Sequence, residues 1–386
     1  MNELLKSVPE SYFASVSTLN ENLEIGEKPL INMAVGIPDG RAPESVTETI
    51  KSAADDPVNH KYPGFRGRPS FKKAIIDFYK RHYDVELKDE NIAILYGTKS
   101  MLVQFPMIFI EPGEGVYLPD PGYADYGAGV NLARGIKYDL PLLKENRFLP
   151  DYESLDPDEL DNARLIYLNY PSNPLGTVAT KEFFEETINR FKDTGTKIVH
   201  DFAYAAFGYE GRHPSILQSD PEFSTAIEVY SFSKSYNMSG FRSGFAVGNK
   251  EMIEAINIYQ DHTQTGMWGV LQEASITALN EEDDFLIRQN EIFKARKDKV
   301  VGALSEAEIP IRPIDGGIFG WIRVPEGFDG ESFVEYLLKE ASILATPGIP
   351  FGTRGRDFIR ISLAVDDVDL DECIERLKSI SHLWNQ

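Results

Sequence analysis

Three residues of the sequence carry groups that suit covalent chemistry on a carbonyl compound. Lys234 ends the run Ser231-Phe232-Ser233-Lys234, in a segment rich in serine, aromatic residues and glycine that can hold its amine away from bulk water. Asp201 supplies a carboxylate, and Arg242, eight residues after Lys234, supplies a cation. An amine kept out of bulk water can attack a carbonyl carbon, so this group predicts a nucleophile with two charged neighbours.

Other catalytic signatures in the sequence are weaker. Ser231 and Lys234 also fit the S-x-x-K pattern of serine acyl-enzymes, but the SDN and KTG segments that accompany it are absent. Gly97-Thr98-Lys99-Ser100 is similar to the end of a nucleotide-binding P-loop but lacks the adjacent Gly-Lys pair. The sequence contains no GxGxxG, no HExxH and no paired cysteines, so we expect neither a dinucleotide site nor a metal site.

The elements that would position these residues alternate between strands and helices. Short β-branched runs that end in turn residues predict seven strands, at 92–96, 116–118, 136–140, 165–169, 197–200, 227–232 and 245–247. Apolar residues near helical spacing predict helices between several of them, including 100–109, 123–134 and 180–191. This alternation predicts an α/β fold with a mainly parallel, helix-covered sheet. A polar helical region, 250–305, and a second strand-and-helix unit from about 309 predict an additional, smaller domain.

The residues that follow the predicted strands should meet at one edge of the sheet. In open α/β sheets, ligands bind beyond the carboxyl ends of the strands. The residues there are the turn Gly97-Thr98-Lys99, the aromatic Tyr123, the amide Asn173, the carboxylate Asp201 with the phenol Tyr204, and Lys234. Pyridoxal phosphate needs such groups together, because its aldehyde reacts with a lysine, its ring nitrogen pairs with a carboxylate, and its phosphate binds a backbone turn and a cation.

Composition narrows the classes of function further. The 386 residues include 39 Lys and Arg against 61 Asp and Glu, for a net charge of −22, which excludes a nucleic-acid binder that works by phosphate neutralisation. The length predicts two or three domains. Cys373 is the single cysteine, so no intrachain disulfide can form. The sequence shows no apolar export signal or membrane span, and we expect a cytoplasmic protein that does not bind membranes.

From about Ile31 to Leu363, the chain resembles the class I/II aminotransferases, which are pyridoxal-phosphate enzymes of fold type I. The S-x-S-K motif followed after eight residues by arginine carries much of this resemblance. It implies that Lys234 is the Schiff-base lysine, that Ser231 and Arg242 bind the phosphate, and that Ser233 belongs to the cofactor site.

Further motifs extend the resemblance around the cofactor. The D-x-A-Y segment implies that Asp201 binds the pyridine nitrogen and Tyr204 the ring 3-oxygen, and Asn173, in a segment similar to P-x-N-P-x-G, implies a second ligand of that oxygen that also reaches the substrate. Gly97-Thr98-Lys99 resembles the loop whose backbone amides hold the phosphate at the start of a helix. Tyr123 resembles the aromatic residue that stacks on the cofactor ring.

At the substrate end, Arg360 resembles the arginine that pairs with the α-carboxylate, a task that favours a planar guanidinium over lysine. Gly36 matches the glycine whose missing side chain lets this carboxylate approach. Tyr62, in Tyr62-Pro63-Gly64, resembles the tyrosine that crosses a dimer interface to the partner's phosphate. The resemblance therefore implies a homodimer with shared active sites.

The resemblance implies a large cofactor-binding domain, residues 45–285, and a small α/β domain built from residues 1–44 and 286–386. It also implies an aminotransferase that moves an amino group between an amino acid and a 2-oxo acid by a ping-pong Schiff-base mechanism, with Lys234, Asp201 and Tyr204 as its catalytic residues. A β-eliminating carbon–sulfur lyase would share every cofactor residue, and a non-catalytic pyridoxal-phosphate-binding module is a further alternative.

Within the family, residues 262–268 and 272–274 resemble the diaminopimelate and alanine-type branch. Gln264, Thr265 and Trp268 depart from that branch's D-S-G-x-F pattern, and Ile37 replaces the acidic residue that often follows the glycine at 36. These departures leave the substrate open. We expect a donor from the diaminopimelate or neutral amino acid range, 2-oxoglutarate as acceptor, and a pocket narrowed by Trp268.

Overall fold

Seven strands form the central sheet, at the positions where the sequence predicts them. The computed structural model describes residues 2–8 and 28–385. The strands are β2 (Ile92–Leu95), β3 (Gly115–Asp120), β4 (Ile136–Pro141), β5 (Ala163–Asn169), β6 (Lys197–Asp201), β7 (Ala226–Ser231) and β8 (Gly244–Gly248). Their order is β2-β8-β7-β6-β5-β3-β4, with β8 antiparallel to both neighbours and every other pair parallel. The prediction of a mainly parallel sheet is confirmed.

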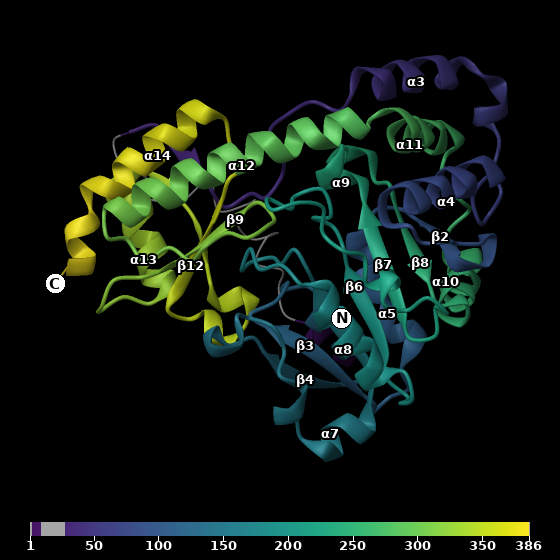
Figure 1. Ribbon diagram of the computed structural model, residues 1–386, viewed down its shortest axis with the longest axis horizontal. Helices are drawn as coiled ribbons and strands as arrows, with labels where there is room; N and C mark the ends of the chain where they lie inside the picture. Colours follow the sequence, from purple (N-terminus) through teal and green to yellow (C-terminus); the bar gives the residue numbers. More distant parts are fainter. Residues whose placement is uncertain (1, 9–27, 386) are drawn as a thin grey trace.

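Helices cover both faces of this sheet (Figure 1). One face packs against helices that include α3 (Glu44–Asp55), α4 (Pro69–Tyr83), α8 (Lys181–Phe191) and α11 (Gly269–Glu281). The other packs against α5 (Thr98–Phe109), α6 (Tyr126–Leu132) and α10 (Lys250–Thr263). Strand β2 shows why: Ile92 and Ile94 join the first cluster of buried side chains, and Ala93 and Leu95 join the second. Side chains that alternate along a strand reach opposite faces, so a strand buried on both is apolar throughout.

Two helix boundaries differ from the prediction in ways that affect the site. Helix α5 begins at Thr98 rather than Ser100, directly after Gly97, whose φ of +71° suits glycine. Helix α6 begins at Tyr126 rather than Tyr123, because residues 123–125 form a turn after β3. Tyr123 therefore lies in a turn at the sheet edge and not within a helix.

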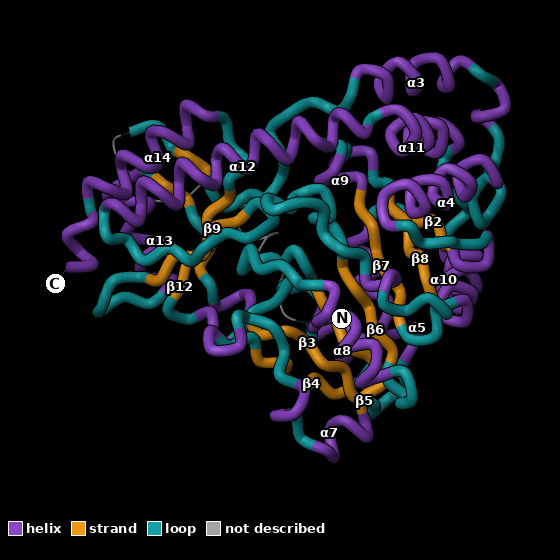
Figure 2. The backbone as a smooth tube through the Cα atoms, viewed as in Figure 1, coloured by secondary structure: helices purple, strands orange, loops and turns teal. Residues whose placement is uncertain are grey.

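A second unit lies beside the sheet, at the left of Figure 1 and Figure 2. It contains α12 (Asp283–Glu306), β9 (Phe319–Arg323), α13 (Gly330–Tyr336), β10 (Ile343–Leu344), β11 (Thr346–Pro347), β12 (Phe358–Ser362) and α14 (Asp367–Ser379). Strands β11, β12 and β9 form an antiparallel sheet, and β1 (Ile31–Asn32) pairs in parallel with β10. The segment around β1 thus joins the carboxy-terminal unit, whereas α1 (Glu3–Lys6) lies against α6, where Asn131 Nδ2 donates to the Ser7 carbonyl oxygen at 2.7 Å.

The domain boundaries at residues 44/45 and 285/286 stay a prediction. The separate clusters of buried apolar side chains in the two units support it. Residues 1 and 9–27 of the predicted first segment lie outside the described residues. Short helices also occur, among them α1 (Glu3–Lys6), α7 (Pro157–Asn162) and α9 (Phe232–Ser235). No helix among the described residues is long and apolar enough to cross a membrane.

Candidate active site

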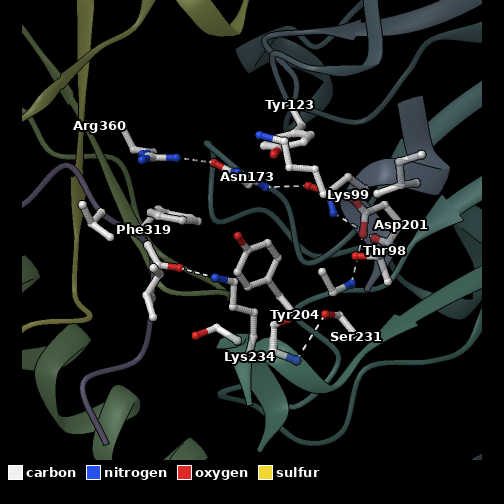
Figure 3. A pocket seen from close by; sticks show the side chains of 18 of the residues that line it. Thr98, Lys99, Tyr123, Asn173, Asp201, Tyr204, Ser231, Lys234, Phe319 and Arg360 are labelled. Atoms are coloured by element: carbon white, nitrogen blue, oxygen red, sulfur yellow. Dashed lines mark hydrogen bonds between the residues drawn. The ribbon is translucent and has the colours of Figure 1, made fainter. Parts of the chain in front are cut away.

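A cavity of about 780 Å³ lies where the carboxyl edge of the central sheet meets the second unit. Most of the predicted site residues line it: Gly36, Thr98, Lys99, Tyr123, Asn173, Asp201, Tyr204, Ser231, Ser233, Lys234, Arg242 and Arg360. Gly97 lies against this cavity through its contact with Arg242, and Tyr62 does not line it. Figure 3 shows the labelled side chains converging from both units.

One end of the cavity has the groups that bind a phosphate. Gly97 precedes the amino terminus of α5, and a Cβ at this position would lie 2.2 Å from Nη2 of Arg242, so only glycine allows the guanidinium this close. Ser231 closes β7, and its Oγ accepts a hydrogen bond of 3.2 Å from the backbone N–H of Ser233. Lys99 pairs with Asp125 at 2.9 Å. A helix amino terminus, a guanidinium and hydroxyl groups together suit a phosphate dianion.

Asp201 places a buried carboxylate on the floor of the cavity. It is the last residue of β6; its Oδ2 accepts a hydrogen bond of 2.7 Å from the Tyr126 hydroxyl and its Oδ1 one of 3.1 Å from the Ala203 backbone N–H. Burial raises the pKa of this carboxyl group, and these two hydrogen bonds oppose the rise. Among the described residues, no cationic side chain forms an ion pair with Asp201. The site therefore fits a ligand that brings its own positive charge, as a protonated pyridine does.

Lys234 lies on α9 with its side chain partly buried, and its Nζ donates a hydrogen bond of 2.5 Å to the Gly36 carbonyl oxygen. Burial lowers the pKa of this amine to about 8, and the positive charges of Arg360 and Arg242 contribute in the same direction. Roughly a tenth of the amine is therefore neutral and nucleophilic at pH 7, far more than for a lysine with an ordinary pKa.

The opposite end of the cavity is built around Arg360 on β12, which is only 2% exposed. Its Nη1 donates to Asn173 Oδ1 at 2.9 Å, and its Nη2 donates to the Ala34 carbonyl oxygen at 2.6 Å. The guanidinium carbon lies 4.1 Å from the ring centre of Phe319 and 4.8 Å from that of Phe351. Amide and carbonyl partners and two aromatic rings therefore fix the direction of the guanidinium.

The packing around position 36 gives a second reason for a glycine there, besides the approach of the substrate carboxylate that the resemblance implies. A Cβ there would lie 2.4 Å from the ring of Phe319. The same ring contacts the guanidinium of Arg360 and meets Tyr204 edge-on, with centroids 5.6 Å apart. The missing side chain at 36 thus makes room for the aromatic ring that contacts Arg360.

Several residues of the site were missed by sequence reasoning. Tyr126 binds Asp201; Asn169 donates to the Asp201 carbonyl oxygen at 2.8 Å and accepts from the Asn173 backbone N–H at 2.7 Å. Asn169 ends a predicted strand, which is a usable signal, and Tyr126 follows Tyr123 by three residues. Phe319 comes from the second unit, and the sequence holds no local signal for its contact with Arg360.

Two expected residues lie elsewhere in the single chain. Tyr62 is 88% exposed, so its role at a partner's phosphate stays a prediction. Trp268 donates from Nε1 to the Asn59 carbonyl oxygen at 2.8 Å and does not line the cavity. Within one chain, therefore, Trp268 does not narrow the pocket as expected, because this hydrogen bond holds its ring beside the 57–64 segment.

Comparisons with known proteins identify the family of this chain. Residues 28–377 match the family described as aminotransferase class I and II. A solved aminotransferase from Staphylococcus aureus is 50% identical, with a TM-score of 0.96 and full coverage of both chains. The L-glutamine–4-(methylsulfanyl)-2-oxobutanoate aminotransferase of Bacillus subtilis (strain 168) is 40% identical over 98% of this chain and 96% of its own. The LL-diaminopimelate aminotransferase of Aquifex aeolicus (strain VF5) is 38% identical over 98% of both.

The chain belongs to the class I and II aminotransferase family. It is a pyridoxal-phosphate-dependent aminotransferase of fold type I, acting on an amino acid and a 2-oxo acid. The buried Asp201 carboxylate and the close approach of Arg242 to Gly97 fit the two charged ends of this cofactor.

Proposed function

We propose that this chain performs amino transfer with Lys234 as nucleophile and proton carrier, Asp201 as partner of the pyridine nitrogen and Arg360 as ligand of the substrate α-carboxylate. The observation that carries the assignment is that these three side chains line one cavity, with Asp201 and Arg360 buried and Lys234 partly buried. When bound, pyridoxal phosphate supplies an electrophilic carbon and a ring that withdraws electrons.

The residues divide the work along the cavity. The residues that would hold the phosphate end are Gly97, Thr98, Lys99, Ser231, Ser233 and Arg242. Tyr123, Asn173 and Tyr204 would contact the ring and its oxygen. Arg360 orients the substrate, and Gly36 leaves room beside it. With the cofactor bound and its own amine free, Lys234 would accept the proton from the substrate Cα and return it to the cofactor carbon, because a pKa of about 8 allows both acceptance and donation near neutral pH.

Borohydride reduction followed by peptide mapping tests the first assignment. The cofactor should be found attached to Lys234, and attachment to another lysine would refute it. Asp201→Ala should retain some cofactor through the phosphate end yet lose most turnover, since the remaining groups do not pair with the pyridine nitrogen. An Asp201→Ala enzyme with full turnover would contradict the role of this carboxylate.

For the substrate, we propose a donor with a neutral side chain or diaminopimelate, with 2-oxoglutarate as acceptor. The relatives named above act on glutamine with a thioether oxo acid and on LL-diaminopimelate. The cavity wall near Gly36 carries Val35 and Ile37, which are apolar and partly exposed. A screen of amino donors tests this. It compares kcat/KM for methionine, glutamine, alanine and LL-diaminopimelate with that for aspartate, with 2-oxoglutarate and pyruvate as acceptors. A strong preference for aspartate would contradict the proposal.

We also propose a homodimer in which Tyr62 acts at the partner's site. Supporting it, Val58, Tyr62, Phe65 and Trp268 are exposed, and the segments that carry them touch through the hydrogen bond from Trp268 to Asn59. Exposed apolar groups that gather in this way mark interaction surfaces. A cytoplasmic location remains a prediction of the sequence.

Mixing subunits tests the dimer. In a heterodimer of Tyr62→Phe and Lys234→Ala chains, one site carries both lesions and the other carries none. Activity should therefore return on mixing two inactive proteins, and a fully active monomer would refute the proposal.

A further inference from the structure

The turn that follows β3 is hydrogen-bonded to the turn that precedes β12. Asp120, the last residue of β3, is buried. Its Oδ2 accepts hydrogen bonds from Thr353 Oγ1 at 2.8 Å and Arg354 Nη1 at 2.9 Å, and its Oδ1 accepts one from the Arg354 backbone N–H at 3.2 Å. The Gly122 N–H donates to the Phe351 carbonyl oxygen at 2.7 Å. Four hydrogen bonds thus join the central sheet to the second unit at this point.

The two turns meet closely enough to require a glycine. Gly352 has a φ of +135°, and a Cβ there would lie 2.1 Å from Asp120 Oδ1. Side chains with a Cβ rarely adopt that φ, and the carboxylate fills the space that a Cβ would need. The contact therefore differs from an exposed ion pair, whose partners move freely in solvent and add little stability.

The fastened turn positions an aromatic ring against Arg360. Phe351 is 2% exposed and meets Trp321 edge-on, with centroids 5.9 Å apart. Its ring centre lies 4.8 Å from the guanidinium carbon of Arg360, whose other aromatic contact is Phe319. Hydrogen bonds thus join Asp120 to Thr353 and Arg354, and the backbone of the same turn carries the Phe351 ring that contacts the guanidinium.

We propose that Asp120 is a positioning residue for substrate-carboxylate binding. By holding the turn 351–354, it keeps the Phe351 ring against Arg360 and so keeps the guanidinium aligned for a planar, two-point contact. The proposal depends on the role proposed above for Arg360.

Asp220 is a matched control for the loss of a buried carboxylate. It is 2% exposed, and its oxygens accept backbone N–H bonds from Ser224 at 3.0 Å, Thr225 at 2.8 Å and Ala226 at 3.0 Å. These residues lie at the amino end of β7, at the opposite edge of the sheet from the cavity. Asp220→Asn should lower the melting temperature without a selective effect on substrate binding.

The experiment compares Asp120→Asn, Arg354→Gln, the double variant and Asp220→Asn as holoenzymes. For Asp120→Asn we expect KM for an amino acid to rise about tenfold with kcat changed less than about threefold, which marks lost binding rather than lost chemistry. The affinity for a carboxylic acid of substrate size that lacks an amino group should fall by the same factor. This affinity is measured from the change in cofactor absorbance on binding. Cofactor affinity of the apoprotein and KM for an amine without a carboxylate should stay unchanged. The double variant should lose no more substrate affinity than the more damaging single variant, because both single changes break the same contact between Asp120 and Arg354.

The positioning role is overturned if Asp220→Asn raises KM equally, if the amine is affected as much as the amino acid, or if the two single changes add. It is also overturned if the KM for amino acids does not change in Asp120→Asn. Arg360→Lys separates the two proposals. If that change weakens amino acid binding while Asp120→Asn does not, only the positioning role fails; if Arg360→Lys has no effect, the role of Arg360 fails as well.

Discussion

Replacing Arg360 with lysine isolates what a planar guanidinium contributes at the substrate end of the cavity. The change keeps a positive charge at this position, and that charge is one cause of the lowered pKa of Lys234. The nucleophile should therefore keep its protonation behaviour, which an alanine substitution would disturb. What the lysine cannot keep is the fork that donates to Asn173 Oδ1 and the Ala34 carbonyl oxygen while presenting a flat face to Phe319 and Phe351.

The size of the loss follows from these contacts. Two charge-assisted hydrogen bonds to a carboxylate contribute about 1.5 to 3 kcal/mol each, and they are not additive. An ammonium group recovers part of one of them, but Arg360 is buried, so water does not readily replace the other. We expect a net loss of about 2 to 4 kcal/mol in kcat/KM, or roughly 30- to 1000-fold. Cofactor binding should hardly change, because the groups proposed to bind the phosphate lie around Arg242 at the other end.

The assay measures steady-state kcat/KM for two substrates. One is the best amino acid donor, and the other is the amine that has the same side chain but no carboxylate. Arg360→Lys should reduce the first and leave the second nearly unchanged. The affinity of the apoprotein for pyridoxal phosphate, from the quenching of protein fluorescence, is the control. If both substrates kept their wild-type kcat/KM, the orientation of the substrate proposed here would be wrong.

Three further predictions concern other parts of the cavity. Tyr126→Phe removes a hydrogen-bond donor to the Asp201 carboxylate, so the pKa of that carboxyl group should rise further. The binding free energy of the cofactor should then weaken by about 1.5 kcal/mol, or roughly tenfold in affinity. Unchanged affinity in a fluorescence titration would show that the Tyr126 hydroxyl does not support the carboxylate. The rate at which the apoprotein captures pyridoxal phosphate should rise with the neutral fraction of Lys234 and level off above about pH 8; a stopped-flow rate that still climbs at pH 10 would contradict this. Gly36→Ala should cost about 1 to 3 kcal/mol of unfolding free energy through overpacking against an aromatic ring, while Gly302→Ala, at an exposed position of α12 with open space around it, serves as control. Equal melting temperatures for the two variants would count against the packing argument.

The central sheet could be predicted because its strands are buried on both faces. Runs such as Ile92 to Leu95 are apolar throughout and stop at turn residues, so the position of a strand is visible in the sequence. Its direction is not: nothing in the run 244–248 indicates that β8 lies antiparallel between β2 and β7. The two-residue pairing of β1 with β10 joins residues more than 300 positions apart and carries no local signal either.

The candidate site divides in the same way. Lys234, Asp201 and Asn173 were accessible to sequence reasoning because each lies at or just beyond the end of a strand, where the fold itself gathers polar groups. Phe319 and Phe351 reach Arg360 only because the second unit packs on the sheet edge, and aromatic residues in a strand or a turn predict a core before they predict a site. The part that could not be predicted is therefore the layer of residues that holds the functional groups in place.

The distribution of charge in the cavity links its two ends to the lysine between them. Arg242 and Arg360 both lower the pKa of Lys234, after burial, which is the largest cause. An anion that pairs with either arginine offsets its positive charge and lets the pKa of the amine rise. Lys234 is thus most nucleophilic when both arginines are without anions, and it becomes a stronger base when a phosphate meets Arg242 and a carboxylate meets Arg360. One amine can therefore act first as nucleophile and later as proton acceptor, because the charges at the two ends change between the two tasks.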